Sequence, residues 1–147
     1  MKYQKQPNRW SCLPTAFAMA LDIPVEEVFE FCGHDGSATV FPDCVDPHCR
    51  QSFHIQEMID LCYFHQKLVT QIDCVLSSAN IGGQQYVVKN DRERVLAYMR
   101  EYHGVLVGSV NGHPHAVVWV GHIVDPDNVP YDVDNFDIRS FFIIKSI

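Results

Sequence analysis

The sequence has none of the long apolar segments that mark membrane or secreted proteins. Residues 1–7 contain no apolar run resembling a signal peptide. No stretch approaches the roughly 18 consecutive apolar residues that a membrane-spanning helix needs. We therefore expect a cytoplasmic protein with no membrane partner.

Clusters of positive charge are also missing. The 147 residues carry 11 Lys and Arg against 18 Asp and Glu, a formal net charge of -7. The basic residues are scattered, and Arg92, Arg94 and Arg100 share a predicted helix with acidic neighbours. Because an acidic surface repels phosphate backbones, nucleic acid is not an expected partner.

Paired cysteine motifs are absent, although the chain has six cysteines, at 12, 32, 44, 49, 62 and 74. No C-x-x-C spacing indicates a redox motif or a zinc ribbon, so we expect free thiols. Cysteine and histidine are nevertheless dense in one window, and zinc takes such ligands: Cys32, His34, Cys44, His48, Cys49, His54, Cys62 and His65. Their spacings match no closed zinc site, so we predict no metal and no cofactor. His54 is instead expected to pack against or cap the helix that begins near Phe53.

The length and the hydrophobic content of 47% predict a single domain over residues 1–147 with an ordinary packed core. Apolar periodicity predicts helices over 11–21, 25–32, 53–66 and 91–102. Strand-like runs cover 67–76, 104–110, 115–120 and 141–144, with a hairpin loop at 111–114 and a turn at 80–85. The long unpatterned segment 33–50 is predicted to border a substrate cleft. Helices first and strands after indicate an α+β fold.

Cys12 is the first candidate for chemistry, because it stands at the start of a predicted buried helix. Ser11 is expected to cap that helix. The positive end of the helix dipole favours thiolate over thiol and so arms the sulfur as a nucleophile. A nucleophilic cysteine also needs a base within hydrogen-bond reach and a group that orients the base.

His115 and Asp125 are the candidates for these two roles. His115 opens the most apolar strand, and a reversal near 120–121 would place Asp125 on the adjacent antiparallel strand, opposite His115. There the carboxylate would bind Nδ1 of the imidazole and fix its tautomer. The alternative interpretations are a histidine that bonds the hairpin backbone and an Asp-Pro pair that only makes a turn.

Gln6 is the fourth candidate, six residues before Cys12. Its amide, together with the backbone N–H of Cys12, would donate to the oxyanion that forms on an attacked carbonyl. Gln4 is a rival for this role, and a solvated polar side chain is the other interpretation.

The order Gln, Cys, His, Asp resembles that of the papain-like cysteine peptidases. More narrowly, residues 12–19, Cys-Leu-Pro-Thr-Ala-Phe-Ala-Met, resemble the nucleophile helix of the bacteriocin-processing (double-glycine leader) peptidases, which runs roughly Cys-Gly-Pro-Thr-Ala-x-Ala-Met. Residues 115–121 and the pair at 125–126 resemble the His strand and Asp-Pro strand of that group. The resemblance spans most of the chain. Leu13 in place of Gly and a short His-to-Asp step are its departures.

The resemblance implies a papain-like fold, with the nucleophile helix packed on a C-terminal antiparallel sheet. It implies the roles of oxyanion donor, nucleophile, base and orienting group for Gln6, Cys12, His115 and Asp125. The expected function is a cysteine hydrolase that cleaves a peptide, isopeptide or related amide bond of a peptide or protein through a thiol acyl-enzyme. A non-catalytic papain-like binding module and an acyltransferase on the same scaffold are the alternatives.

Overall fold

The computed structural model describes residues 1–38, 52–74, 79–86, 91–129 and 132–147. Over these residues the chain has the predicted α+β class, with four α-helices and a five-stranded antiparallel sheet. No helix in these ranges is long and apolar enough to cross a membrane. The elements, in chain order, are α1 (Cys12–Leu21), α2 (Val25–Cys32), α3 (Ile55–Phe64), β1 (Lys67–Asp73), β2 (Ala79–Ile81), β3 (Gln84–Tyr86), α4 (Arg92–Glu101), β4 (Gly104–Val110), β5 (His113–Trp119), β6 (Ile123–Val124), the 3-10 turn η1 (Val133–Asn135) and β7 (Asp137–Ser146).

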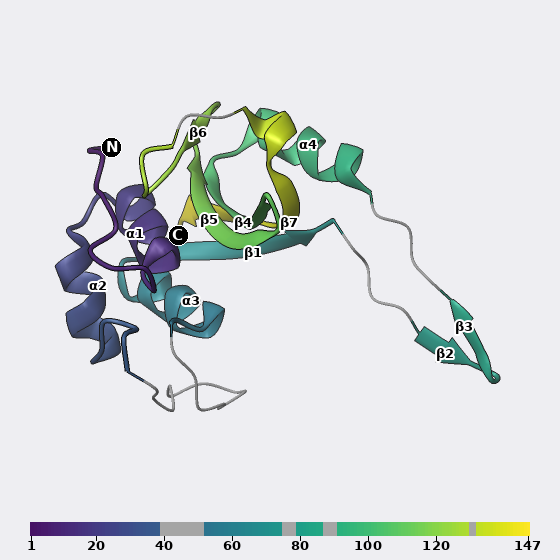
Figure 1. The fold of residues 1–147 in the computed structure, drawn as a ribbon, viewed down its shortest axis with the longest axis horizontal. Helices are drawn as coiled ribbons and strands as arrows, with labels where there is room; N and C mark the ends of the chain where they lie inside the picture. The colour runs from purple at the N-terminus through teal and green to yellow at the C-terminus, as the bar shows by residue number, and fades with distance from the viewer. Residues whose placement is uncertain (39–51, 75–78, 87–90, 130–131) are drawn as a thin grey trace.

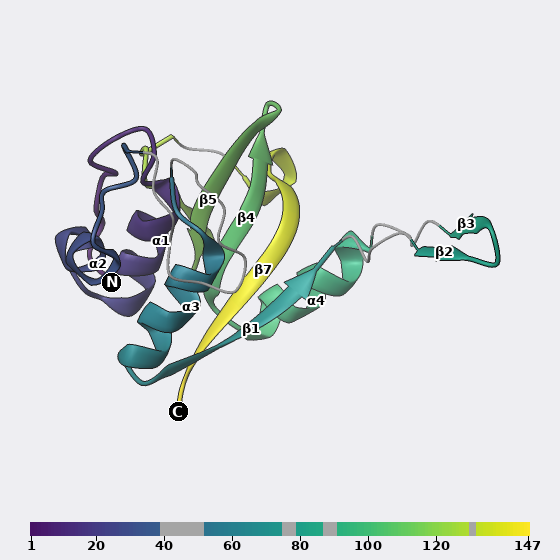
Figure 2. The same cartoon turned by 90° about the horizontal axis from the view of Figure 1, so that it is seen from below.

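The sheet has the strand order β1-β7-β4-β5-β6 (Figure 1). The C-terminal strand β7 therefore lies between β1 and β4, and it is longer than the predicted 141–144 because both neighbours pair with it. β2 and β3 form a separate hairpin that lies away from the sheet in both views (Figures 1 and 2). Its turn is the predicted Gly82-Gly83 segment.

Helices cover both faces of the sheet, and each face has its own core (Figure 2). On one face, α1, α2 and α3 bury side chains such as Phe17, Val28 and Met58 against Val105 and Val118 of the sheet. On the other face, α4 and η1 pack on the opposite side of the same strands, with the fully or almost fully buried residues Val95, Met99, Leu106, Val117, Phe136 and Phe141. The two layers hold β4 and β5 rigidly from both sides.

α1 is buried along most of its length, as its almost continuous apolar sequence predicts. Its residues 14–19 are all buried, and the helix packs on β5 and β4. It ends at Asp22, which has a left-handed φ of 59° and donates its N–H to the carbonyls of Ala18 and Met19. Pro24 then prevents continuation of the helix. The first residue of this fixed helix, Cys12, is thereby held at the sheet.

The β4–β5 hairpin is tighter than predicted. Only Asn111 and Gly112 form the turn, with φ of 50° and 79°, and β5 begins at His113 instead of His115. Positive φ at both central residues is what a two-residue hairpin needs to match the twist of its strands. The predicted loop over 111–114 is therefore wrong, and His115 lies inside β5, paired with Gly108.

Candidate active site

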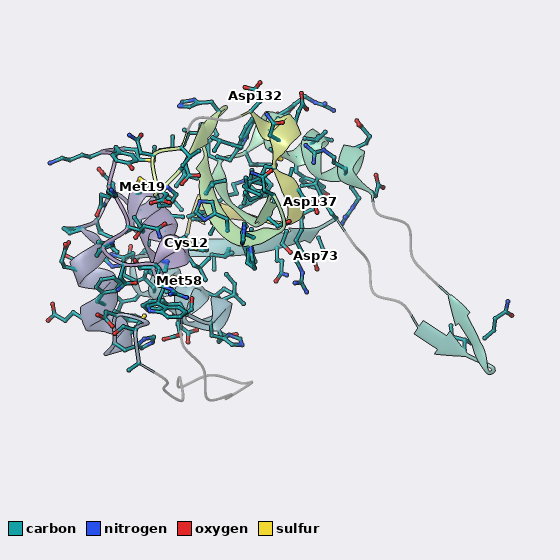
Figure 3. All side chains as sticks on the ribbon, viewed as in Figure 1. Cys12, Met19, Met58, Asp73, Asp132 and Asp137 are labelled. Carbon is teal, nitrogen blue, oxygen red and sulfur yellow. The ribbon has the colours of Figure 1, made fainter. Side chains whose placement is uncertain are left out.

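Cys12 is the first residue of α1, and Figure 3 shows it between the helices and the sheet. The predicted Ser11 side-chain cap is wrong: the Ser11 hydroxyl donates to the Asn8 carbonyl at 3.0 Å and accepts from the Asn8 N–H at 3.2 Å. The hydroxyl is therefore used in a turn with Asn8 and does not bond the N-terminus of α1. Ser11 thus leaves the backbone N–H groups of Cys12 and Leu13 uncapped at the positive end of the helix, where an anion is favoured.

His115 lies between Cys12 and a carboxylate. Its imidazole hydrogen-bonds Asp125 and lies close enough to the Cys12 side chain to interact with it, and its own side chain is 17% exposed. Asp125 Oδ1 lies 2.9 Å from Nε2 of the ring, so the predicted contact at Nδ1 is wrong. With Nε2 engaged by the carboxylate, Nδ1 is the nitrogen left for the sulfur. The three side chains form one array with the imidazole in the middle.

The array changes the protonation of His115. Burial is the largest single effect and lowers the pKa of the imidazole, because it disfavours the charged form. Hydrogen bonds to Asp125 and Cys12, and the negative charge of both, together outweigh burial and raise the pKa of His115 to about 9. At neutral pH the imidazole is therefore a cation beside the sulfur. A neighbouring cation is one of the features that favour a nucleophilic thiolate.

Asp125 reaches His115 from an unexpected register. Val118 pairs with Val124 and Trp119 with Ile123, so the reversal is centred on Gly121 and Asp125 follows the end of β6 opposite Val117. The predicted direct pairing of 115 with 125 is wrong, and the carboxylate reaches across diagonally. Asp125 is buried, with 5% of its surface exposed, and its Oδ1 also accepts the backbone N–H of Asp127 at 2.6 Å.

Gln6 is held by two hydrogen bonds, one to the segment after Asp125 and one to the turn before Cys12. Its backbone N–H donates to the Pro126 carbonyl at 2.8 Å, next to Asp125. Its amide Nε2 donates to the Asn8 carbonyl at 3.1 Å, in the turn that leads into α1. The rival Gln4 is occupied elsewhere: its amide bonds the Ile23 carbonyl and the Val25 N–H between α1 and α2, at 2.6 and 2.8 Å.

Asn8 is a residue that we did not identify from the sequence, and it organises the approach to Cys12. Its carbonyl orients the Gln6 amide, and its Oδ1 accepts the Trp10 N–H at 2.8 Å. Its Nδ2 donates to the Asp35 carbonyl at 3.1 Å. The pair Pro7-Asn8 is a turn signal, because an Asn side chain commonly bonds the backbone two residues on. That signal was present in the sequence.

The same turn touches the base of the long segment 33–50. The Ser52 N–H donates to the Gly36 carbonyl at 2.8 Å, and the Ser52 hydroxyl donates to the Trp10 carbonyl at 3.0 Å. The two ends of the segment thus meet beside the residues that precede Cys12. Residues 39–50 lie outside the described ranges, so their place at a cleft stays a prediction.

A second group of ionisable side chains lies between α2 and α3, and we name it the α2–α3 group. It consists of Cys32, His34 and Glu57. Glu57 Oε2 lies 2.7 Å from His34 Nε2, and the Glu57 carboxylate also lies close enough to the Cys32 thiol to interact with it. Burial, then the Glu57 charge and this close interaction, raise the pKa of Cys32 to about 12. Cys32 is therefore a protonated, unreactive thiol.

The rest of the Cys/His-rich window has structural roles where it is described. His54 caps α3, as expected: its Nδ1 accepts the Gln56 N–H at 3.0 Å, and Glu57 Oε1 accepts the His54 N–H at 2.8 Å. Within the described ranges no three His, Cys, Asp or Glu side chains are placed to share a metal ion. Cys44, His48 and Cys49 lie outside those ranges.

The chain matches no protein-family model, no curated protein and no solved structure.

Proposed function

We propose that this chain is a cysteine hydrolase that cleaves a peptide, isopeptide or related amide bond through a thiol acyl-enzyme. One observation carries the proposal: Cys12, at the N-terminus of a buried helix, lies beside His115, whose ring nitrogen Nε2 lies 2.9 Å from the buried Asp125. A thiol, an imidazole and a carboxylate in this order are a nucleophile, its base and the group that orients the base.

The array can perform both halves of the reaction. The Cys12 thiolate attacks the carbonyl carbon of the amide, and negative charge develops on the carbonyl oxygen. The donors for that oxygen are the uncapped Cys12 N–H and the second N–H of the Gln6 amide, whose first N–H bonds the Asn8 carbonyl. The His115 imidazolium gives its proton to the leaving amine nitrogen as the carbon–nitrogen bond breaks. His115 then takes a proton from water, whose oxygen attacks the thioester and releases Cys12.

Asp125 acts through His115 in this mechanism. Its carboxylate holds the imidazole in one orientation and stabilises the imidazolium, and it keeps its own negative charge throughout. Burial of Asp125 strengthens this interaction, because water screens it little. The resemblance of residues 12–19 and 115–126 to the bacteriocin-processing peptidases supports the same roles and a papain-like arrangement of helix and sheet.

The test is covalent labelling of the purified protein with peptide acyloxymethyl ketones, which react with the thiolate of active cysteine peptidases. We expect mass spectrometry to find a single adduct on Cys12, and we expect no adduct in the His115→Ala variant. Hydrolysis of a peptide library by the unlabelled protein then defines the substrate. A Cys12 that stays unlabelled by every probe would favour the non-catalytic binding module.

A further inference from the structure

A cavity adjoins the proposed active site on the side of His115. Its volume is about 270 Å³, and it lies between the tip of the β4–β5 hairpin and the segment after β6. Val110, Pro114 and Val129 give it apolar walls, and His115, Asp125 and Asp127 give it polar ones. His113 also contributes to the lining.

The cavity lies on the side of the active site where the leaving amine of the substrate would be bound. His115 lines it and Cys12 does not, so it lies beyond the imidazole as seen from the sulfur. In the proposed reaction the acyl part of the substrate is attached to Cys12, while the leaving amine must reach His115 to be protonated. The cavity is thus next to the residue that follows the scissile bond. Ligand pockets are commonly about 300–1,000 Å³, so this one is suited to a single side chain.

The charges around the cavity favour a cation. Asp125 and a protonated His115 neutralise one another at 2.9 Å. Asp127 has no ion-pair partner among the described residues, so its negative charge is left over. Nearby Tyr3, which donates to the Pro126 carbonyl at 3.3 Å, senses this field: burial and then the charges of Asp125 and Asp127 raise its pKa.

We propose that this cavity binds the side chain of a lysine or arginine that directly follows the scissile bond. The aliphatic stem of such a side chain packs against Val110, Pro114 and Val129, and its charged end meets Asp127. The inference rests on the proposed function, since it assigns the leaving-group side of the same site.

The test uses the reverse of the leaving step. The p-nitrophenyl ester of N-acetylglycine acylates Cys12: the sulfur–carbonyl bond forms, the ester carbon–oxygen bond breaks, and p-nitrophenol leaves with the His115 proton, then ionises in the buffer to the coloured p-nitrophenolate. His115 is left neutral. An added amino acid amide then competes with water for the thioester. Its α-amine nitrogen attacks the carbonyl, the carbon–sulfur bond breaks, and the amine proton passes to His115 as the Cys12 thiolate is released. The yield of the new amide, measured by mass spectrometry, reports binding of the incoming side chain beside His115.

Argininamide and citrullinamide are the matched probes, because their side chains have nearly the same shape and only arginine is charged. We expect argininamide to give about threefold more product, the size of effect that one largely exposed ion pair supplies. Asp127→Asn should remove this preference. The variant keeps the backbone N–H that Asp125 accepts, so the orientation of Asp125 is retained. Glu101→Gln, at the exposed end of α4, should keep the full preference.

Equal yields from the two amides in an enzyme that forms the thioester would overturn the assignment of the cavity and leave the hydrolase intact. Absence of both the p-nitrophenolate burst and the Cys12 thioester would instead overturn the proposed function. The cavity is then judged in the Cys12→Ala protein, from the backbone amide NMR signals of His115 and Asp127. Shifts with argininamide but not citrullinamide support the site without catalysis, and shifts with neither reject it.

Discussion

Among the residues that the structure describes are two groups of a cysteine, a histidine and a carboxylate, and they differ in which member is in the middle. In one, the imidazole of His115 stands between Cys12 and Asp125. In the α2–α3 group, the carboxylate of Glu57 stands between Cys32 and His34. The same residue types thus meet in a different order.

The order decides the state of the thiol. An imidazole in the middle can hold a positive charge beside the sulfur, which stabilises the thiolate. A carboxylate in the middle puts a negative charge there and accepts the thiol proton, so the pKa of Cys32 is raised to about 12. Nearness of a histidine to a cysteine therefore does not by itself indicate a nucleophile. The α2–α3 group instead joins α2 to the start of α3, where Glu57 completes the cap with His54.

Substitutions in the two groups should differ most in their effect on the rate of turnover. We expect His115→Ala to lower the rate of peptide hydrolysis by roughly 10⁴-fold, as loss of the function of a catalytic triad does. His34→Ala removes the ion pair with Glu57 and should lower the stability of the protein while leaving its turnover per folded molecule nearly unchanged. Initial rates normalised to the folded fraction provide the measurement, and His122→Ala, an exposed histidine, is the control. Equal losses in His115→Ala and His34→Ala would mean that both groups are merely structural.

Alkylation by iodoacetamide compares the two thiols directly. At pH 7 a thiol with a pKa of about 12 is ionised to only about one part in 10⁵, whereas an ordinary cysteine is a few per cent thiolate. We therefore expect Cys12 to react at least ~10³-fold faster than Cys32. The rates are read residue by residue by mass spectrometry over short exposures.

The His115→Ala variant sharpens the same experiment. Removal of the neighbouring cation should slow the alkylation of Cys12 at pH 7 and leave that of Cys32 unchanged. A Cys12 that alkylates as slowly as the buried Cys62, and ignores the change at His115, would mean that the array does not activate its thiol.

The oxyanion role of Gln6 provides a smaller contrast, with Gln4 as its internal control. We expect Gln6→Ala to lower kcat by roughly 10²-fold with little change in KM, the usual result of losing one oxyanion donor. Gln4→Ala should leave kcat intact and cost about 1 kcal/mol of stability per lost hydrogen bond, because its amide links α1 to α2. Steady-state kinetics and urea unfolding of both variants distinguish the roles. A Gln6→Ala enzyme with normal kcat would leave the backbone N–H as the donor.

The sequence was sufficient to predict features that depend on local chemistry. The start of α1 at Cys12, the apolar strand that carries His115 and the cap of α3 by His54 each depend on a few neighbouring residues. The close approach of His115 and Asp125 could also be predicted from the sequence, because only a short chain reversal separates the two residues.

For features that depend on contacts between distant residues, the sequence predictions were wrong or absent. The nitrogen of His115 that faces Asp125 depends on the side from which Cys12 approaches, and that is set by packing of α1 on the sheet. The insertion of β7 between β1 and β4 joins residues far apart in the chain, so periodicity does not predict it. The α2–α3 group was missed because nothing in the sequence signals that Glu57 is buried.

The two groups contribute to the stability of the protein in separate pH windows. The pKa of His115 is raised from 6.5 to about 9 in the folded protein. Its contribution is fully present below pH 6.5, where the unfolded chain is also protonated, and is lost as the pH rises through 9. The free energy of unfolding should fall by up to about 3 kcal/mol over this window.

The pKa values of Cys32 and Cys62 are raised from 9.0 to about 12, so their contributions are lost only above pH 9. Urea unfolding at closely spaced pH values should therefore show His115→Ala flattened between pH 6.5 and 9 and still falling at higher pH. Cys32→Ser should keep the first fall and lessen the second. Parallel curves for the wild type and His115→Ala across pH 6.5 to 9 would show that the imidazole gains no charge-stabilising contacts on folding, and the array would lose its physical basis.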